Sequence, residues 1–184
     1  MKMRAAKVFS VLLLVAGISA AQSSSLWIDV PFVQQSREGC GAASLAMVMQ
    51  YWQKQRGQPA AEASDAPYIL KQLHSPEGHG IYASGMEHYL KGHGYRTFAF
   101  AGEWADLQEH LEKGRPLIVA LKPSDWGKAL HYVVVAGIDS DSDLVMFNDP
   151  AGRKLTRLDR KTFEKEWDAA GHWTLLALPQ KAES

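Results

Sequence analysis

The chain has a single cysteine, Cys40, among its 184 residues. Disulfides need cysteines in pairs, so this protein has no disulfide framework of its own. It also lacks an excess of charge of either sign, because 20 Lys and Arg residues balance 20 Asp and Glu residues. The sequence has no cluster of basic residues that would bind the phosphates of a nucleic acid. We therefore expect no nucleic-acid partner.

Long apolar runs are missing too, apart from a short one near the N-terminus. Three basic residues among the first seven precede VFSVLLLVAGI, and small residues follow it. This order is typical of a secretory signal peptide, and the run is shorter than the about 20 residues of a spanning helix. We predict a signal peptide over residues 1–21, with cleavage after Ala20 or an uncleaved anchor as alternatives. The mature protein is then periplasmic or secreted, with no membrane association after cleavage.

The remaining sequence has no internal repeat or linker, which predicts a single domain over residues 22–180 and a disordered tail over 181–184. Apolar residues at three- and four-residue steps predict a helix over Gly41–Trp52, and Ser84 is a candidate N-cap of a later one. RLDRKTFEKEWDAAG also has a helical pattern. Strand patterns dominate the second half, where HYVVVAGID and LVMFNDP predict a hairpin. Helices followed by a mainly antiparallel sheet give an α+β class.

Cys40 lies between Gly39 and Gly41, directly before the predicted helix. A sulfur there faces unpaired N–H groups and the positive end of the helix dipole, and both favour the thiolate. We expect the two glycines to leave open space in which a substrate backbone approaches the sulfur. An unpaired thiol in an oxidising compartment is a liability unless it is buried or reactive, so a buried structural cysteine is the alternative.

The predicted hairpin supplies a base for such a thiolate. A turn centred near Ser140 places His131 directly opposite Asp149, and opposed residues have Cβ atoms roughly 4.5–5.5 Å apart. A slip of one residue would present Asn148 instead. A nucleophile, a base and a group that orients the base are the parts that covalent catalysis needs. We therefore propose Cys40, His131 and Asp149 as catalytic candidates.

Other residues are candidates for supporting roles. The amide of Gln34, six residues before Cys40, and the Cys40 backbone N–H are candidates for an oxyanion hole, with Gln35 as the alternative to Gln34. Trp126, in the loop before His131, is a candidate wall of the substrate site. No second cysteine or HExxH motif accompanies the histidines, so we expect no metal and no other cofactor.

The segments VPFVQQSREGCGAASLAMVMQYW, ALHYVVVAGID and VMFNDPAG resemble the bacteriocin-processing, double-glycine leader peptidase family of papain-like cysteine peptidases, over most of the mature chain. The resemblance implies a papain-like fold, with the cysteine helix in an N-terminal helical part and the histidine and aspartate on a C-terminal sheet. It also implies that Cys40 is the nucleophile, His131 the base, Asp149 the orienting acid and Gln34 the oxyanion donor.

Members of that family are commonly cytoplasmic domains of peptide exporters that cut after a Gly-Gly pair. The export signal predicted here indicates a free-standing, exported relative, which leaves the Gly-Gly requirement open. We expect a cysteine peptidase that processes peptides or protein leaders outside the cytoplasm, with an export or assembly system as a candidate partner. The alternatives are a γ-glutamyl or acyl transferase of the phytochelatin-synthase type and a peptide-binding module without turnover.

Overall fold

The computed structural model describes residues 25–124 and 129–180. The predicted signal peptide, the predicted tail and Trp126 lie outside these described residues. The helices are α1 (Cys40–Gln55), the short η1 (Glu62–Ser64), α2 (Ala66–Leu73), α3 (Ala83–Gly92), α4 (Trp104–Glu112) and α5 (Arg160–Asp168). The strands are β1 (Ser25–Trp27), β2 (Tyr95–Ala101), β3 (Leu117–Leu121), β4 (His131–Asp139), β5 (Leu144–Asn148), β6 (Thr156–Asp159) and β7 (Trp173–Pro179).

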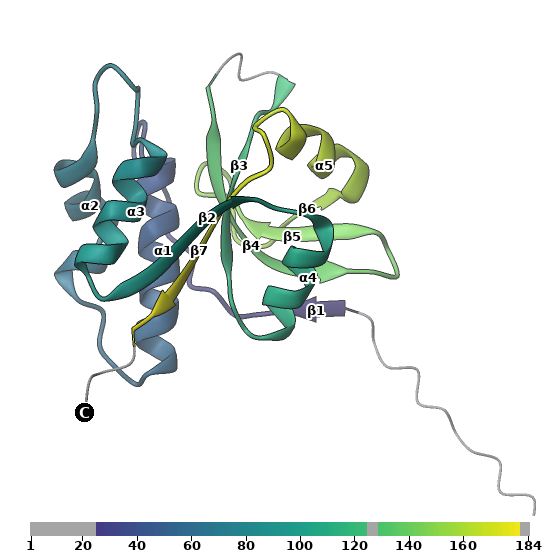
Figure 1. Ribbon diagram of the computed structural model, residues 1–184, viewed down its shortest axis with the longest axis horizontal. Helices are drawn as coiled ribbons and strands as arrows, with labels where there is room; N and C mark the ends of the chain where they lie inside the picture. The colour runs from purple at the N-terminus through teal and green to yellow at the C-terminus, as the bar shows by residue number, and fades with distance from the viewer. Residues whose placement is uncertain (1–24, 125–128, 181–184) are drawn as a thin grey trace, which may run out of the picture.

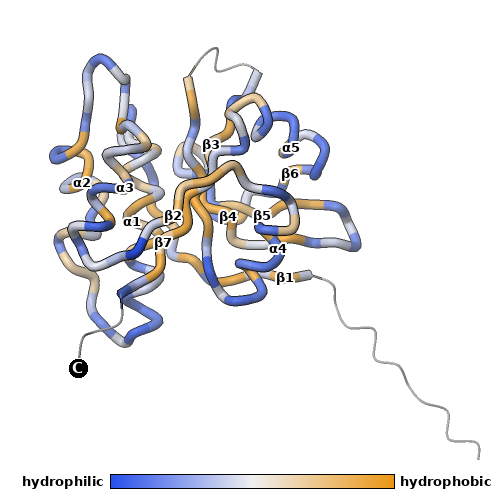
Figure 2. Tube along the Cα trace, in the orientation of Figure 1, coloured by the Kyte–Doolittle hydropathy of each residue, from blue (hydrophilic) through white to orange (hydrophobic). Residues whose placement is uncertain are grey.

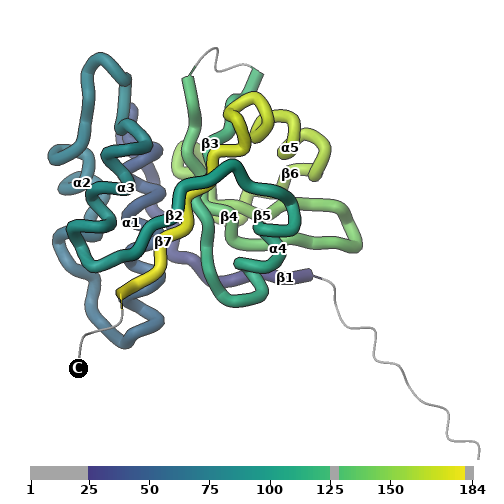
Figure 3. The backbone as a smooth tube through the Cα atoms, viewed as in Figure 1, coloured from purple at the N-terminus to yellow at the C-terminus, as the bar shows by residue number. Residues whose placement is uncertain are grey.

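Within the described residues, the strands form one antiparallel sheet in the order β2-β7-β3-β4-β5-β6, and β1 pairs with the far end of β4. Figure 3 traces β2 alongside β7, which brings the segment after α3 against the last strand. None of the helices among the described residues is long and apolar enough to cross a membrane.

Helices cover both faces of this sheet, as Figure 1 shows: α1, α2 and α3 lie on one side, and α4 and α5 on the other. Successive side chains of a strand point to opposite faces. Accordingly, Tyr132, Val134 and Ala136 belong to the core beneath α1, and Val133 and Val135 belong to the core beneath α4 and α5. Burial on both faces explains the unbroken apolar sequence of β4, which lies within the hydrophobic centre of Figure 2.

The first turns of α1 are fixed against the start of β4. Small residues such as Ala42 and Ala43 are fully buried there, which lets the helix approach the sheet closely. The buried hydroxyl of Ser44 donates to the carbonyl of Tyr132 at 3.1 Å. This hydrogen bond joins the element that begins at Cys40 to the strand that begins at His131.

The predicted α+β class, with a helical N-terminal part and an antiparallel C-terminal sheet, is confirmed. Two local predictions were wrong. Ser84 lies inside α3, whose N-cap is Tyr82. The segment predicted as one helix from Arg157 begins instead as β6, because these residues pair with β5, and α5 starts only at Arg160. The side chain of Asp159 caps α5 by accepting a hydrogen bond from the Thr162 N–H at 2.9 Å.

Candidate active site

Cys40 is the first residue of α1, and Gly39 is its N-cap. The cysteine is partly exposed and lines a cavity, unlike the fully buried Leu45 and Met47 farther along the helix. A cysteine that served only to pack the core would be expected to be as buried as they are. Its position favours a reactive thiol over a structural one.

The two flanking glycines do not leave the open space that the sequence suggested. Both are buried. A Cβ added at Gly41 would lie 3.3 Å from Cβ of Ile81, and one added at Gly39 would lie 3.0 Å from the backbone oxygen of Ser36. The glycines therefore allow close packing around Cys40, so the expectation of an opening at these positions was wrong.

His131 and Asp149 are hydrogen-bonded. Nε2 of His131 donates to Oδ1 of Asp149 at 2.7 Å, and the two side chains are 4% and 23% exposed. The carboxylate is held in turn, because the same Oδ1 accepts the N–H of Ala151 at 2.9 Å. Gly152 makes room for it, since a Cβ there would approach Oδ2 to 2.8 Å.

The register behind this contact differs from the prediction. Asp139 pairs with Leu144, so the turn is centred later than Ser140, and a bulge interrupts β4 farther on. Val134 pairs with Asn148, the last residue of β5. The strands therefore do not place His131 and Asp149 directly opposite each other, and that prediction was wrong. Asp149 lies beyond the strand end and reaches the imidazole diagonally.

Asn148, the alternative partner of the histidine, is engaged elsewhere. Its side chain is fully buried, and its Nδ2 donates to the carbonyls of Val30 and Pro31 at 3.2 and 3.3 Å. Its Oδ1 accepts the N–H of Leu155 at 3.0 Å. Asn148 thus anchors the segment that leads to Cys40, and Asp149 is the residue that meets the imidazole.

The pKa values in this cluster follow from its contacts. Burial disfavours the charged imidazole, but hydrogen bonds to Asp149 and Cys40 and the negative charges of these groups outweigh it and raise the pKa of His131 to about 9. For Asp149, burial acts to raise the pKa, but the hydrogen bond and positive charge of His131 prevail and hold this pKa below its ordinary value. At neutral pH the pair is an imidazolium beside a carboxylate.

The two candidate oxyanion glutamines differ in orientation. Gln34 is exposed, and its Nε2 donates to the carbonyl of Pro150 at 3.0 Å, which leaves the second amide hydrogen for another acceptor. The Gln35 backbone N–H donates to the same carbonyl at 2.9 Å, and its side-chain oxygen is buried. Gln34 is therefore the glutamine whose amide faces outward.

A cavity of about 380 Å³ opens beside the sulfur of Cys40. Its walls include residues 78–83 and Ala129, Leu130 and Tyr132. Residues 78–83 could not be assigned to the site from the sequence, because only tertiary packing brings this segment to the cysteine. Among the described residues, no cluster of three His, Cys, Asp or Glu side chains is arranged to hold a metal ion.

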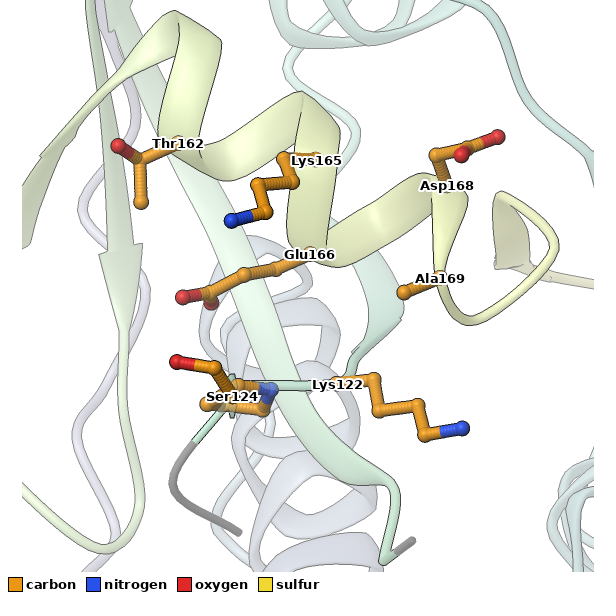
Figure 4. Close-up of a pocket in the computed structure, with 8 residues that line it drawn as sticks. Lys122, Ser124, Thr162, Lys165, Glu166, Asp168 and Ala169 are labelled. Atoms are coloured by element: carbon orange, nitrogen blue, oxygen red, sulfur yellow. The ribbon is translucent and has the colours of Figure 1, made fainter. Parts of the chain in front are cut away.

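A second cavity, of about 460 Å³, lies between the end of β3 and α5. Figure 4 shows Lys165 and Glu166 of α5 reaching from the helix toward the segment that carries Lys122 and Ser124. None of the candidate catalytic residues lines this cavity, so the cavity at Cys40 is the candidate active site.

Comparison with known proteins agrees with the geometry. The chain shares 34% identity over 137 residues with the transport/processing ATP-binding protein ComA of Streptococcus pneumoniae (strain ATCC BAA-255 / R6), which covers 73% of this chain and 17% of ComA. The fold is similar to that of the peptidase domain of Streptococcus ComA (TM-score 0.63, 23% identity, 83% of this chain and 100% of that one).

It is also similar to a double glycine motif protease from an AMS/PCAT transporter in complex with the leader peptide (TM-score 0.61, 21% identity, 84% of this chain and 94% of that one). Residues 27–174 match the Peptidase C39 like family. The chain therefore belongs to the Peptidase C39-like family of cysteine peptidases, which are hydrolases.

Proposed function

We propose that this protein hydrolyses peptide bonds with Cys40 as nucleophile, His131 as acid and base, and Asp149 as the residue that orients the imidazole. The proposal is carried by the contacts that the His131 imidazole makes. It donates to Asp149 at 2.7 Å through Nε2, and its pKa is raised by both Asp149 and Cys40. In this arrangement the nucleophile Cys40 contacts the base His131, which in turn contacts the orienting group Asp149.

The chemical steps follow from these contacts. The Cys40 sulfur attacks the carbonyl carbon of the scissile bond, and the imidazolium of His131 gives its proton to the departing amine. Water then attacks the resulting thioester while the imidazole takes a proton from it, and the thiolate leaves with the imidazolium restored. Asp149 keeps Nε2 occupied, so that Nδ1 remains for the exchange with sulfur and substrate.

The negative charge on the carbonyl oxygen needs hydrogen-bond donors during both attacks. The Cys40 backbone N–H at the start of α1 and the outward-facing amide of Gln34 are the donors that we assign. The bond from Gln34 to the Pro150 carbonyl ties this amide to the residue after Asp149. The same bond therefore aligns the oxyanion donor with the catalytic carboxylate.

We assign peptides or protein leaders as substrates. A similar protease has been solved with a leader peptide, which supports peptide substrates for this fold. The basic, apolar and small-residue order of residues 1–21 supports export, so we place the reaction in the periplasm or outside the cell, next to an export or assembly system. N-terminal sequencing of the protein recovered from its native compartment tests export, and a first residue of Met1 would contradict signal cleavage.

Peptide hydrolysis is tested by mass spectrometry of a peptide library incubated with the wild-type protein and with Cys40→Ser. The proposal expects products with free carboxyl termini from the wild type alone. Products that carry a new amide to an added amine, without hydrolysis, would instead identify a transferase. Binding of library peptides without any product would identify a binding module.

A further inference from the structure

The contacts among Cys40, His131 and Asp149 do not explain what the cavity beside Cys40 binds. Ile81 and Tyr132 are nearly buried, at 7% and 6% exposed, and form its base. Tyr82 and Leu130 also line it, and they are among the few large apolar side chains of the described residues that stand exposed, at 54% and 43%. Exposed apolar side chains that cluster around a cavity are typical of a binding site.

Among the described residues, which exclude 125–128 next to Ala129, the lining of this cavity includes no Asp, Glu, Lys or Arg. A charged substrate side chain packed against Ile81, Tyr82 and Leu130 would lose water without gaining a partner of opposite charge from these three residues, which is unfavourable. An apolar or aromatic side chain would instead lose contact with water and gain contact with Tyr82 and Leu130, which is favourable. The volume of about 380 Å³ is within the usual range of roughly 300–1,000 Å³ for ligand pockets, and much of it would stay empty beside a glycine.

The wall that carries Tyr82 is fixed to the segment before the cysteine. Glu38 accepts a hydrogen bond from His74 Nε2 at 2.9 Å, and Nδ1 of His79, on the cavity wall, lies 3.7 Å from its other carboxylate oxygen. The backbone is close as well, since a Cβ added at Gly80 would lie 3.4 Å from the Glu38 carbonyl oxygen. These contacts tie this wall to the segment that leads to Cys40.

We propose that this cavity binds a large apolar or aromatic side chain of the substrate, at one of the two residues that flank the scissile bond. The enzyme then selects Leu, Met, Phe or Tyr at that position and does not require glycine there. This inference rests on the proposed peptidase function, because it places the side chain next to the bond that Cys40 attacks.

The test is a peptide library in which each of the two flanking positions is varied in turn, with kcat/KM measured for each peptide. Wild-type protein should prefer the large apolar residues at one flanking position by about tenfold or more over glycine and over charged residues, the discrimination expected of a hydrophobic pocket. The variant Ala129→Trp fills the cavity from its exposed rim. It should lower kcat/KM about tenfold more for the apolar peptides than for the glycine peptides.

Ala99→Trp is the matched control, because Ala99 is an exposed residue of β2 that does not line the cavity. It should leave both classes of peptide unchanged. Cleavage that depends on Cys40 but demands glycine at both positions, or an equal loss for both classes in Ala129→Trp, would overturn the pocket and leave the peptidase function standing. Failure to cleave every peptide would overturn the peptidase function and the pocket together.

Discussion

Replacing Asp149 by asparagine removes one negative charge from the proposed site and exchanges the carboxylate oxygen next to Gly152 for an NH2 group. The N–H of Ala151 donates to the same oxygen that accepts from His131, so the asparagine oxygen should stay in place and keep both hydrogen bonds. A hydrogen bond that involves a charged group contributes about 1.5–3 kcal/mol, and we expect the ion pair at the upper end of this range and the bond from the imidazolium to a neutral asparagine oxygen at the lower end. The difference, about 1–1.5 kcal/mol, corresponds to about one pKa unit.

The direction of the shift is set by the lost charge. The carboxylate stabilises the imidazolium, so its removal lowers the pKa of His131 from about 9 to about 8 in the variant. The imidazolium is the active form, and therefore the alkaline limb of kcat/KM moves to lower pH. Water screens this pair weakly, because the histidine is 4% and the aspartate 23% exposed.

Steady-state cleavage of one peptide between pH 6 and 10 measures the shift. The ratio of variant to wild-type kcat/KM should fall about fivefold between pH 7 and pH 9, since the wild-type imidazole is half protonated at pH 9 and the variant only about one tenth. The control is Asp139→Asn, at the far end of β4, where the ratio should stay flat. If the alkaline limb of kcat/KM lay at the same pH in Asp149→Asn as in the wild type, the electrostatic role of the carboxylate would be refuted.

The remaining predictions concern the oxyanion donor and the packing around the site. Gln34→Ala should lower kcat about 100-fold by removing an oxyanion donor, whereas Gln35→Ala should not; equal losses, measured by peptide cleavage, would contradict the assignment. Gly41→Val should lower the free energy of unfolding by about 1–3 kcal/mol in urea titrations, because a Cβ there would already lie 3.3 Å from Cβ of Ile81 and valine adds two methyl groups beyond it. Gly92→Ala, with nothing within 4 Å, should not destabilise the protein. Asn148→Ala should cost about 2–3 kcal/mol in the same titration, since it leaves buried backbone groups without partners.

The cysteine helix could be predicted from the sequence because its signals are local. Apolar spacing defined the helix, and the glycines marked its start, so the N-terminus of α1 was located to within a residue. What the glycines do could not be predicted. Their neighbours, Ser36 and Ile81, reach them only through the folded chain, and these contacts close the space that the sequence suggested.

The hairpin shows the opposite case, in which the residues were identified and the geometry was not. The two strand patterns predicted a hairpin, but nothing in residues 139–143 determines which residue is central. The bulge in β4 lies next to Gly137, and a glycine inside a strand pattern is a signal for a bulge that the predicted register did not use. His131 and Asp149 meet nevertheless, because the carboxylate is positioned by the turn after β5. The cavity wall around Tyr82 was missed for a similar reason, since it depends on the contacts of Glu38 with two distant histidines.

The reactivity of Cys40 is the central claim, and alkylation by iodoacetamide at pH 6 tests it most directly. An ordinary thiol is almost fully protonated at that pH and reacts slowly. If His131 and Cys40 form an ion pair, the wild-type protein should be alkylated at least about tenfold faster than free cysteine, and His131→Ala should lose that advantage. Alkylation of the wild type no faster than free cysteine, and unchanged in His131→Ala, would contradict the proposed active site.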